Sequence, residues 1–270
     1  AFNKQVDMLP LFAGGADDVQ GAVRRIAAEE LGVREEEIFG MDLYLYNRMQ
    51  PSVWGKDGEF LSAPRLDDLQ CAYTSFAGFL RGADDRAVNV FACFDNEEVG
   101  SNTKQGAGST FLKDVLERIN EGLGKTREEL CRALASSFMV SCDNAHAVHP
   151  NHPEKTDQSN CVYMNEGIVI KSHAGQQYTS DAFSIAVWRG VCERAGVPVQ
   201  FFANRSDMRG GSTLGNIAMS QVSMNAVDIG LAQLAMHSSY ETAGVRDSEY
   251  MIRAVKAFFD SGICEYTLGR

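Results

Sequence analysis

The residues best suited to chemistry lie at positions 91–101, where a run of apolar residues ends in acidic side chains. Asp95 and Asn96 follow the apolar run, and two adjacent acids come next, Glu97 and Glu98. A strand that ends in this way can deliver one carboxylate to a metal ion while its neighbour takes a proton from a water molecule. Adjacent side chains point in different directions, so the two acids would divide these roles. The alternative is a solvated acidic pair without a function.

Other side chains that bind metals recur further along the chain. Residues 143–153 hold one aspartate and three of the five histidines in the sequence. The candidates from here to the C-terminus are Asp143, His146, His149, His237 and Glu241. Dispersed Asp, Glu and His without a thiolate cluster suit a catalytic zinc, manganese or cobalt site better than a structural zinc site.

Each of these motifs also has a purely structural interpretation. His152 fits an exposed loop, and a helix over 237–241 would bring His237 and Glu241 together as an ordinary i,i+4 contact. Two acids at 67–68 could complement the dipole of a helix that starts there. The glycine-rich residues 210–215 lack the lysine of a P-loop, so backbone amides that grip a carboxylate or a peptide oxygen are favoured over a nucleotide site.

Predicted strands and helices alternate along most of the chain. Apolar runs and alternating patterns predict strands at residues 41–46, 88–94, 137–142, 167–171, 199–203 and 227–231. Helical spacing predicts helices at residues 17–31, 64–80, 110–119, 127–136, 181–195 and 248–259. This order predicts an α/β fold with a mixed, mostly parallel sheet and helices on both faces. No linker is evident, so we expect one domain over residues 1–270, with its site beyond the carboxyl ends of the strands.

Composition excludes several classes of partner. The formal net charge of −11 disfavours nucleic acid, whose binding depends on basic phosphate contacts, and also disfavours an anionic membrane surface. No apolar run approaches the roughly 20 residues of a membrane-spanning helix. The seven cysteines are odd in number, scattered and never spaced as Cys-x-x-Cys, so we expect free thiols in the cytoplasm.

Five sequence blocks together resemble the M18 family of zinc aminopeptidases, in particular the aspartyl aminopeptidases and their bacterial relatives. The blocks lie at residues 63–69, 95–101, 143–151, 211–215 and 236–241, in the order of the family. The resemblance implies a zinc-exopeptidase-like catalytic domain that acts on peptides. It also implies two zinc ions in a complete site, with manganese or cobalt as alternatives, and a homo-oligomer for the full-length enzyme.

The resemblance also implies roles for particular residues. Asp67 would bridge the two metal ions, Glu98 and His237 would complete one metal position, and Asp143 would serve the other. Glu97 would be the general base that deprotonates the bridging water. The residues that correspond to substrate-binding positions are His146, Lys171 and Tyr178, and a lysine there could neutralise an acidic side chain at the N-terminus of the substrate. Arg209 could assist or simply lie in solvent.

One feature departs from the family pattern. The family takes its first metal ligand from a histidine near the N-terminus, whereas no histidine precedes His146 in this sequence. We therefore expect an N-terminally incomplete catalytic domain without the inserted dimerisation domain. This chain alone should bind at most one metal ion well and have little peptidase activity. A catalytically silent fragment or assembly subunit is the main alternative. A third reading is a different di-metal hydrolase, such as a carboxypeptidase or a deacylase.

Overall fold

The computed structural model describes residues 3–14, 21–208 and 210–263. The chain divides into two compact units, Ala1–Tyr46 and Asn47–Arg270. The first unit contains α1 (Ala22–Leu31) and the short 3-10 helix η1 (Glu35–Glu37). Gly32 ends α1 in the left-handed conformation with φ of 65°, which a residue without a Cβ adopts at little cost. The strand predicted at 41–46 is wrong, because these residues pair with none of the described strands.

A four-stranded sheet forms the centre of the second unit. Its strands, in spatial order, are β3 (Phe138–Cys142), β7 (Asn225–Gly230), β5 (Ile168–Ser172) and β6 (Val199–Ala203). β3 runs parallel to β7 and β5 runs parallel to β6, whereas β5 and β7 are antiparallel. The predicted α/β class with a mixed sheet is confirmed.

A second sheet is formed by strands that lie next to candidate site residues along the chain. Its five strands, in spatial order, are β1 (Ser52–Trp54), β2 (Phe60–Ala63), β9 (Glu241–Gly244), β8 (Ala232–Leu234) and β4 (Ala145–His146). Only β4 and β8 pair in parallel, and the other pairs are antiparallel. The sequence did not predict this sheet, because its strands are two to four residues long and carry no clear alternation.

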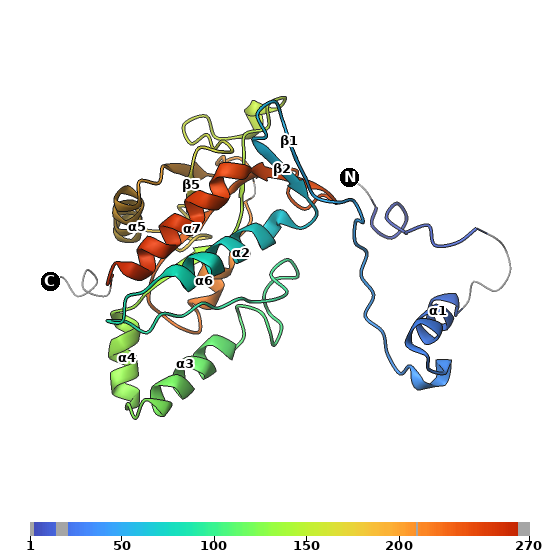
Figure 1. The fold of residues 1–270 in the computed structure, drawn as a ribbon, viewed down its shortest axis with the longest axis horizontal. Coiled ribbons are helices and arrows are strands. Elements are labelled where there is room, and N and C mark those ends of the chain that lie inside the picture. Colours follow the sequence, from blue (N-terminus) through green and yellow to red (C-terminus); the bar gives the residue numbers. More distant parts are fainter. Residues whose placement is uncertain (1–2, 15–20, 209, 264–270) are drawn as a thin grey trace. The chain divides into compact units, whose positions relative to one another are not determined.

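Helices cover both faces of the central sheet (Figure 1). Val227 and Ile229 of β7 pack with Trp188 in the main core, whereas Asp228 between them faces Gly215, as alternation along a strand requires. Helices α5 and α7 therefore lie on one face and α6 on the other. The helices of this unit are α2 (Leu66–Arg81), α3 (Phe111–Gly122), α4 (Arg127–Ala135), η2 (Pro153–Lys155), α5 (Ala182–Ala195), α6 (Leu214–Ala218) and α7 (Val245–Asp260).

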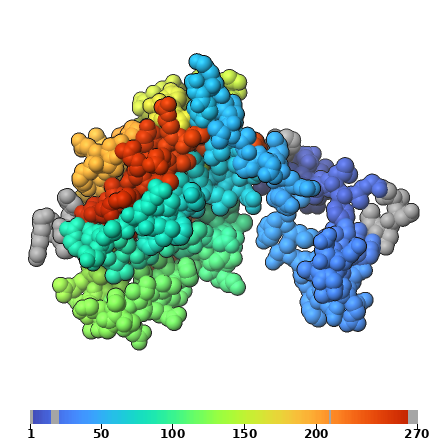
Figure 2. Space-filling model, in the orientation of Figure 1, coloured from blue at the N-terminus to red at the C-terminus, as the bar shows by residue number. Residues whose placement is uncertain are grey.

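Helix α2 packs against α7 through its small residues. Gly78 lies so close to α7 that an added Cβ would be 2.7 Å from the Cβ of Val255. The close contact of the two helices is visible in Figure 2, where the teal surface of α2 adjoins the red surface of α7. The large apolar side chains that share a helical face, including Tyr73 and Leu80, are exposed instead. Close approach of two backbones therefore decides which face of α2 is buried.

The predicted central strand at 88–94 is also wrong. The segment forms no ladder, and Val88 and Val90 are exposed. Phe91 nevertheless packs on α2, with its ring centroid 5.2 Å from that of Phe76. An apolar run becomes a buried strand only where neighbouring strands offer backbone partners, and none of the described strands does so here. The segment still leads into Asp95, as predicted.

The buried carboxylate of Asp247, in the first turn of α7, holds the loop that precedes β5. It accepts hydrogen bonds from the backbone amides of Asn165, at 2.6 Å, and Gly167, at 3.0 Å. Burial raises the pKa of Asp247 to about 7, and the two amide hydrogen bonds oppose this increase only in part. The protonated carboxyl therefore suits the folded protein better than the ionised one.

Stability should accordingly fall as Asp247 ionises. A carboxyl whose pKa is higher in the folded than in the unfolded state stabilises the fold at low pH, and this contribution is lost as the pH rises from about 4 to about 7. Relative to the Asp247→Asn variant, the free energy of unfolding of the natural chain should decrease by roughly 1 to 4 kcal/mol over this range. Urea unfolding of both proteins at several pH values measures the difference. Parallel pH profiles would contradict the expectation.

Candidate metal centre

Asp67 and Asp68 lie where β2 gives way to α2. Arg65 adopts a left-handed conformation, and both aspartates depart from helical backbone angles before the regular part of α2 begins. The peptide bond between the two aspartates is cis. This irregular start replaces the simple helix N-terminus of the structural interpretation. Both Asp67 Oδ1 and Asp68 Oδ1 are buried and make no hydrogen bond.

Two side chains from other parts of the chain, Glu98 and His237, converge on Asp67. His237 Nε2 lies 3.0 Å from Asp67 Oδ2 and 2.9 Å from Glu98 Oε1. Among the described residues, Asp67, Glu98 and His237 form one of two groups whose ligand atoms all lie within 4.8 Å of one another. One imidazole and two carboxylates, with a buried carboxylate oxygen that lacks a partner, match the ligands that a divalent zinc ion takes.

The second group consists of carboxylates only. Asp67 belongs to it as well, together with Asp68 and Asp143. Burial, followed by the charges of Asp143 and Glu98, raises the pKa of Asp67 to about 8. Burial, followed by the charges of Asp143 and Asp67, raises the pKa of Asp68 well above its usual range. Acids crowded in this way repel one another unless protons or cations compensate their charge. The residues therefore fit a cation here too, although no histidine contributes.

Glu97 and Glu98 lie in the loop after residues 88–94, and the loop separates their environments. Asn96 adopts φ of 59°, and Ser101 N donates to Asn96 O, so the backbone turns back immediately at the two acids. Glu98 reaches His237, whereas Glu97 is half-buried. Burial, then the charges of Asp143 and Glu98, raise the pKa of Glu97 to about 7. A carboxyl with a pKa near neutrality can both accept and return a proton.

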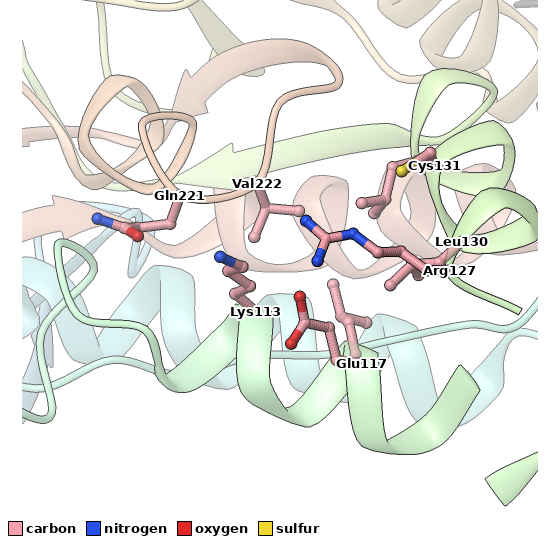
Figure 3. A pocket seen from close by; sticks show the side chains of 9 residues that line it. Lys113, Glu117, Arg127, Leu130, Cys131, Gln221 and Val222 are labelled. Carbon is pink, nitrogen blue, oxygen red and sulfur yellow. The ribbon is translucent and has the colours of Figure 1, made fainter. Parts of the chain in front are cut away.

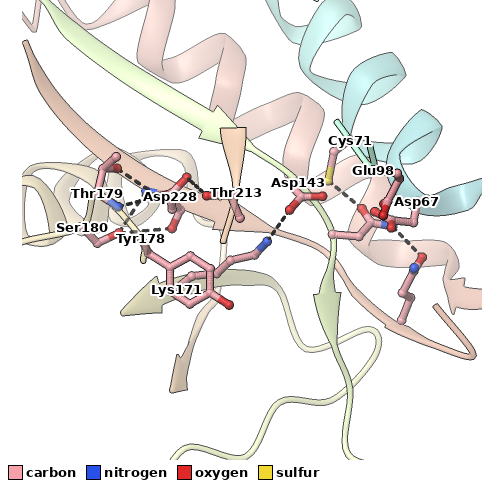
Figure 4. Close-up of polar contacts among 12 residues, drawn as sticks. Asp67, Cys71, Glu98, Asp143, Lys171, Tyr178, Thr179, Ser180, Thr213 and Asp228 are labelled. Atoms are coloured by element: carbon pink, nitrogen blue, oxygen red, sulfur yellow. Dashed lines mark hydrogen bonds and ion pairs between the residues drawn. The ribbon is translucent and has the colours of Figure 1, made fainter. Parts of the chain in front are cut away.

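Lys171 is buried on β5 and donates to Asp143 Oδ2 at 3.0 Å (Figure 4). Burial alone would lower the pKa of Lys171, but Asp143, Tyr178 and Asp228 together outweigh burial, so the pKa rises above its usual range. The ammonium group also lies 5.7 Å from the centre of the Tyr178 ring.

His146 is the last residue of β4. Burial, followed by the charge of Lys171, lowers the pKa of His146, although part of the side chain reaches solvent.

Several predicted candidates lie apart from these groups. The rings of His149 and His152 contact each other, with centroids 5.4 Å apart, and His152 pairs with Glu154 on the surface. Arg209 lies outside the described residues. The helix considered for residues 237–241 is wrong, because residues 237–240 lie in the loop between β8 and β9, and Glu241 begins β9.

The sequence did not predict the hydrogen-bonding roles of two buried acids, Glu241 and Asp228. Glu241 was a candidate ligand, but its carboxylate accepts hydrogen bonds from backbone amides. Asp228 was not considered at all. It accepts hydrogen bonds from the backbone and side chain of Thr179 and from the side chain of Thr213, and so ties the loop after Tyr178 and the glycine-rich turn to β7 (Figure 4). An acid in the middle of an otherwise apolar strand is the signal that could have revealed Asp228.

A cavity of about 120 Å³ lies elsewhere, between α3, α4 and the residues that follow α6 (Figure 3). Leu116, Leu130 and Val222 give it an apolar wall, and Lys113 and Arg127 lie at its rim. None of the candidate site residues lines it. The chemistry therefore belongs to the carboxylate groups rather than to this cavity.

A mixed α/β fold that gathers carboxylates and a histidine from loops and from the start of a helix is consistent with a metal-dependent hydrolase. Residues 7–259 match the family described as aminopeptidase I zinc metalloprotease (M18). The chain belongs to the M18 family. It is 46% identical over 260 residues to the probable M18 family aminopeptidase 2 of Clostridium acetobutylicum, a match that covers 96% of this chain and 60% of that protein.

Solved structures agree with this assignment. An M18 family aminopeptidase from Thermotoga maritima superposes with a TM-score of 0.81 at 25% identity, over 93% of this chain and 57% of that one. The mApe1 dodecamer of S. cerevisiae superposes with a TM-score of 0.75 at 27% identity, over 90% of this chain and 56% of that one. The chain thus spans about 60% of the length of the curated relatives that it matches.

Proposed function

We propose that this chain carries the metal centre of a metal-dependent aminopeptidase, which removes N-terminal Asp or Glu residues from peptides. The observation that carries the proposal is the convergence of Asp67, Glu98 and His237 from three separate segments, with the half-buried Glu97 beside them. Membership of the M18 family supports the reaction class.

We propose that Asp67, Glu98 and His237 hold one ion, and that Asp67 and Asp143 hold a second, beside Asp68. When bound, the ions polarise the scissile carbonyl and lower the pKa of a water molecule. The family description supports zinc, and the same ligand types accept manganese and cobalt.

The side chains of the protein perform the proton transfers. Glu97 takes the proton from water and passes it to the leaving amine, as a group with a pKa near neutrality can. His146 stabilises the developing oxyanion by donating a hydrogen bond. Lys171 and Tyr178 contact the N-terminal side chain of the substrate, and the buried ammonium group of Lys171 gives the preference for an acidic one.

The whole protein would be a homo-oligomer, a proposal supported by the dodecamer of a structural neighbour. Six of the cysteines are free in the described part of the chain, which supports a reducing compartment such as the cytoplasm. None of the described helices combines the length and the apolar character that a membrane crossing needs.

Hydrolysis by the zinc-loaded chain tests the proposal. We would compare an aspartyl chromogenic amide with its N-acetylated form and with the leucyl amide. The proposal predicts zinc-dependent release from the free aspartyl amide and none from the acetylated form, because an aminopeptidase requires a free N-terminus. Cleavage of the acetylated amide would indicate a different di-metal hydrolase.

A catalytically silent form is the second candidate, because the second ligand group has no histidine within the described residues. It predicts zinc binding without turnover of any of the three amides. It also predicts unequal affinities, with one zinc ion held tightly by the group that contains His237 and a second held weakly by the carboxylates alone. Calorimetric titration with zinc measures both sites. Two equally tight sites would contradict this second candidate.

A further inference from the structure

The loops that carry Asp67 and His237 start from the same pair of strands. β2 and β9 are antiparallel, and Ala63 at the end of β2 lies opposite Glu241 at the start of β9. The chain leaves β2 toward Asp67, and it enters β9 from the loop that contains His237. Glu241 therefore lies at the junction of two segments whose side chains meet 3.0 Å apart in the candidate metal centre.

The buried carboxylate of Glu241 links the backbones of these two residues. Oε1 accepts a hydrogen bond from His237 N at 2.7 Å, and Oε2 accepts one from Asp67 N at 2.8 Å. The side chain is almost fully buried, with 2% of the residue exposed. A carboxylate has two acceptor oxygens, so it can serve both amides at once. Each oxygen of Glu241 is thus committed to one candidate ligand residue.

The shape of the His237 loop makes this contact more important. Ala235 and His237 both adopt left-handed backbone conformations, with φ of 58° and 65°. Residues with a Cβ seldom adopt this conformation, which persists when surrounding contacts hold it. The hydrogen bond from His237 N to Glu241 is such a contact, and it fixes the direction in which the imidazole leaves the loop.

We propose that Glu241 is a positioning residue that sets the metal affinity of this centre by fixing the backbones of Asp67 and His237 relative to each other. The inference rests on the proposed metal site. Glu241 does not touch the ion in this account. It keeps two ligands from different segments at the separation that one ion requires.

Replacing Glu241 with Gln tests the role directly. Glutamine keeps the length of the side chain, but it has one acceptor oxygen and turns an NH2 group toward one of the two amides. We expect the affinity for Co²⁺, measured by titration of the metal-free protein and followed by visible absorption, to fall by roughly 10-fold to 100-fold. The visible spectrum should also change, because it reports the ligand geometry around cobalt.

Asp247→Asn provides a matched control. Asp247 is likewise a buried carboxylate that accepts hydrogen bonds from two backbone amides, but those amides belong to Asn165 and Gly167, outside the centre. This variant should bind Co²⁺ like the natural chain, even if both variants lose a similar amount of stability. A merely structural role for Glu241 would leave the affinities of the two variants alike, and would overturn the inference.

If the Glu241→Gln variant does not fold, the Glu241→Asp variant replaces it. Aspartate keeps both acceptor oxygens but is shorter by one methylene, so it cannot reach both amides as well. Its Co²⁺ affinity should fall at least several-fold, and natural affinity with an unchanged spectrum would overturn the inference. Absence of Co²⁺ binding by the natural chain would instead refute the proposed metal site, and the inference with it.

Discussion

The Asp67→Asn variant is expected to bind zinc more weakly at both positions. Asp67 belongs to both ligand groups, and its two oxygens differ, since Oδ2 faces His237 whereas Oδ1 is buried without a partner. Asparagine removes the charge and one acceptor oxygen. Loss of a direct ligand should weaken zinc binding by more than the roughly 100-fold that loss of an outer-shell partner can cause. Competition titration with a chromogenic chelator measures the affinity.

The Asp95→Asn variant is the control for this experiment. Asp95 is an exposed acid in the loop that carries Glu98, and it belongs to neither ligand group. It should bind zinc like the natural chain. If the Asp67 and Asp95 variants bound zinc equally well, the ion would lie elsewhere and the shared role of Asp67 would be wrong.

The Glu97→Gln variant is expected to separate catalysis from metal binding. Glu97 is adjacent to Glu98 but does not belong to either ligand group, so zinc affinity should change little. Glutamine cannot accept the proton of the water, and removal of a general base should lower the rate of hydrolysis by roughly 100-fold to 10,000-fold. Steady-state kinetics with the aspartyl amide, together with zinc content, measures the two properties.

Two results would contradict this assignment. If Glu97→Gln lost zinc together with activity, Glu97 would be a ligand rather than a base. If the variant kept natural activity, the proton acceptor would be another group, and His146 would be the next residue to replace. The Glu98→Gln variant is the matched comparison. It removes the neighbouring carboxylate, and it should lose zinc affinity because Glu98 belongs to the ligand group with Asp67 and His237.

Sequence patterns correctly located the four strands of the central sheet. The predicted strand at 199–203 is β6, and β3, β5 and β7 agree with their predictions to within two residues at each end. The runs at 41–46 and 88–94 are just as apolar but form no ladder. A strand depends on backbone partners from distant segments, and a local pattern contains no information about them.

The candidate site was predictable as a set of residues rather than as a geometry. The acidic and histidine-rich blocks indicated Glu98, Asp143 and His237, and the family resemblance added Asp67. The structure brings Asp67 together with Glu98 and His237 in one group and with Asp143 in the other. The pairing of Lys171 with Asp143 and the contacts of Glu241 with two backbone amides could not be predicted. They depend on how β5, β2 and β9 are arranged in space, which spacing along the chain does not determine.

Anomalous diffraction from crystals grown with zinc, measured at the zinc absorption edge, would locate the bound ions among the candidate ligands. We expect the strongest anomalous peak within coordination distance of Asp67 Oδ2, Glu98 Oε1 and His237 Nε2, roughly 2.0 to 2.2 Å from each ligand atom. A weaker peak, if present, should lie between Asp67 and Asp143. Zinc bound only at other positions, or no peak beside Asp67 at saturating zinc, would contradict the account.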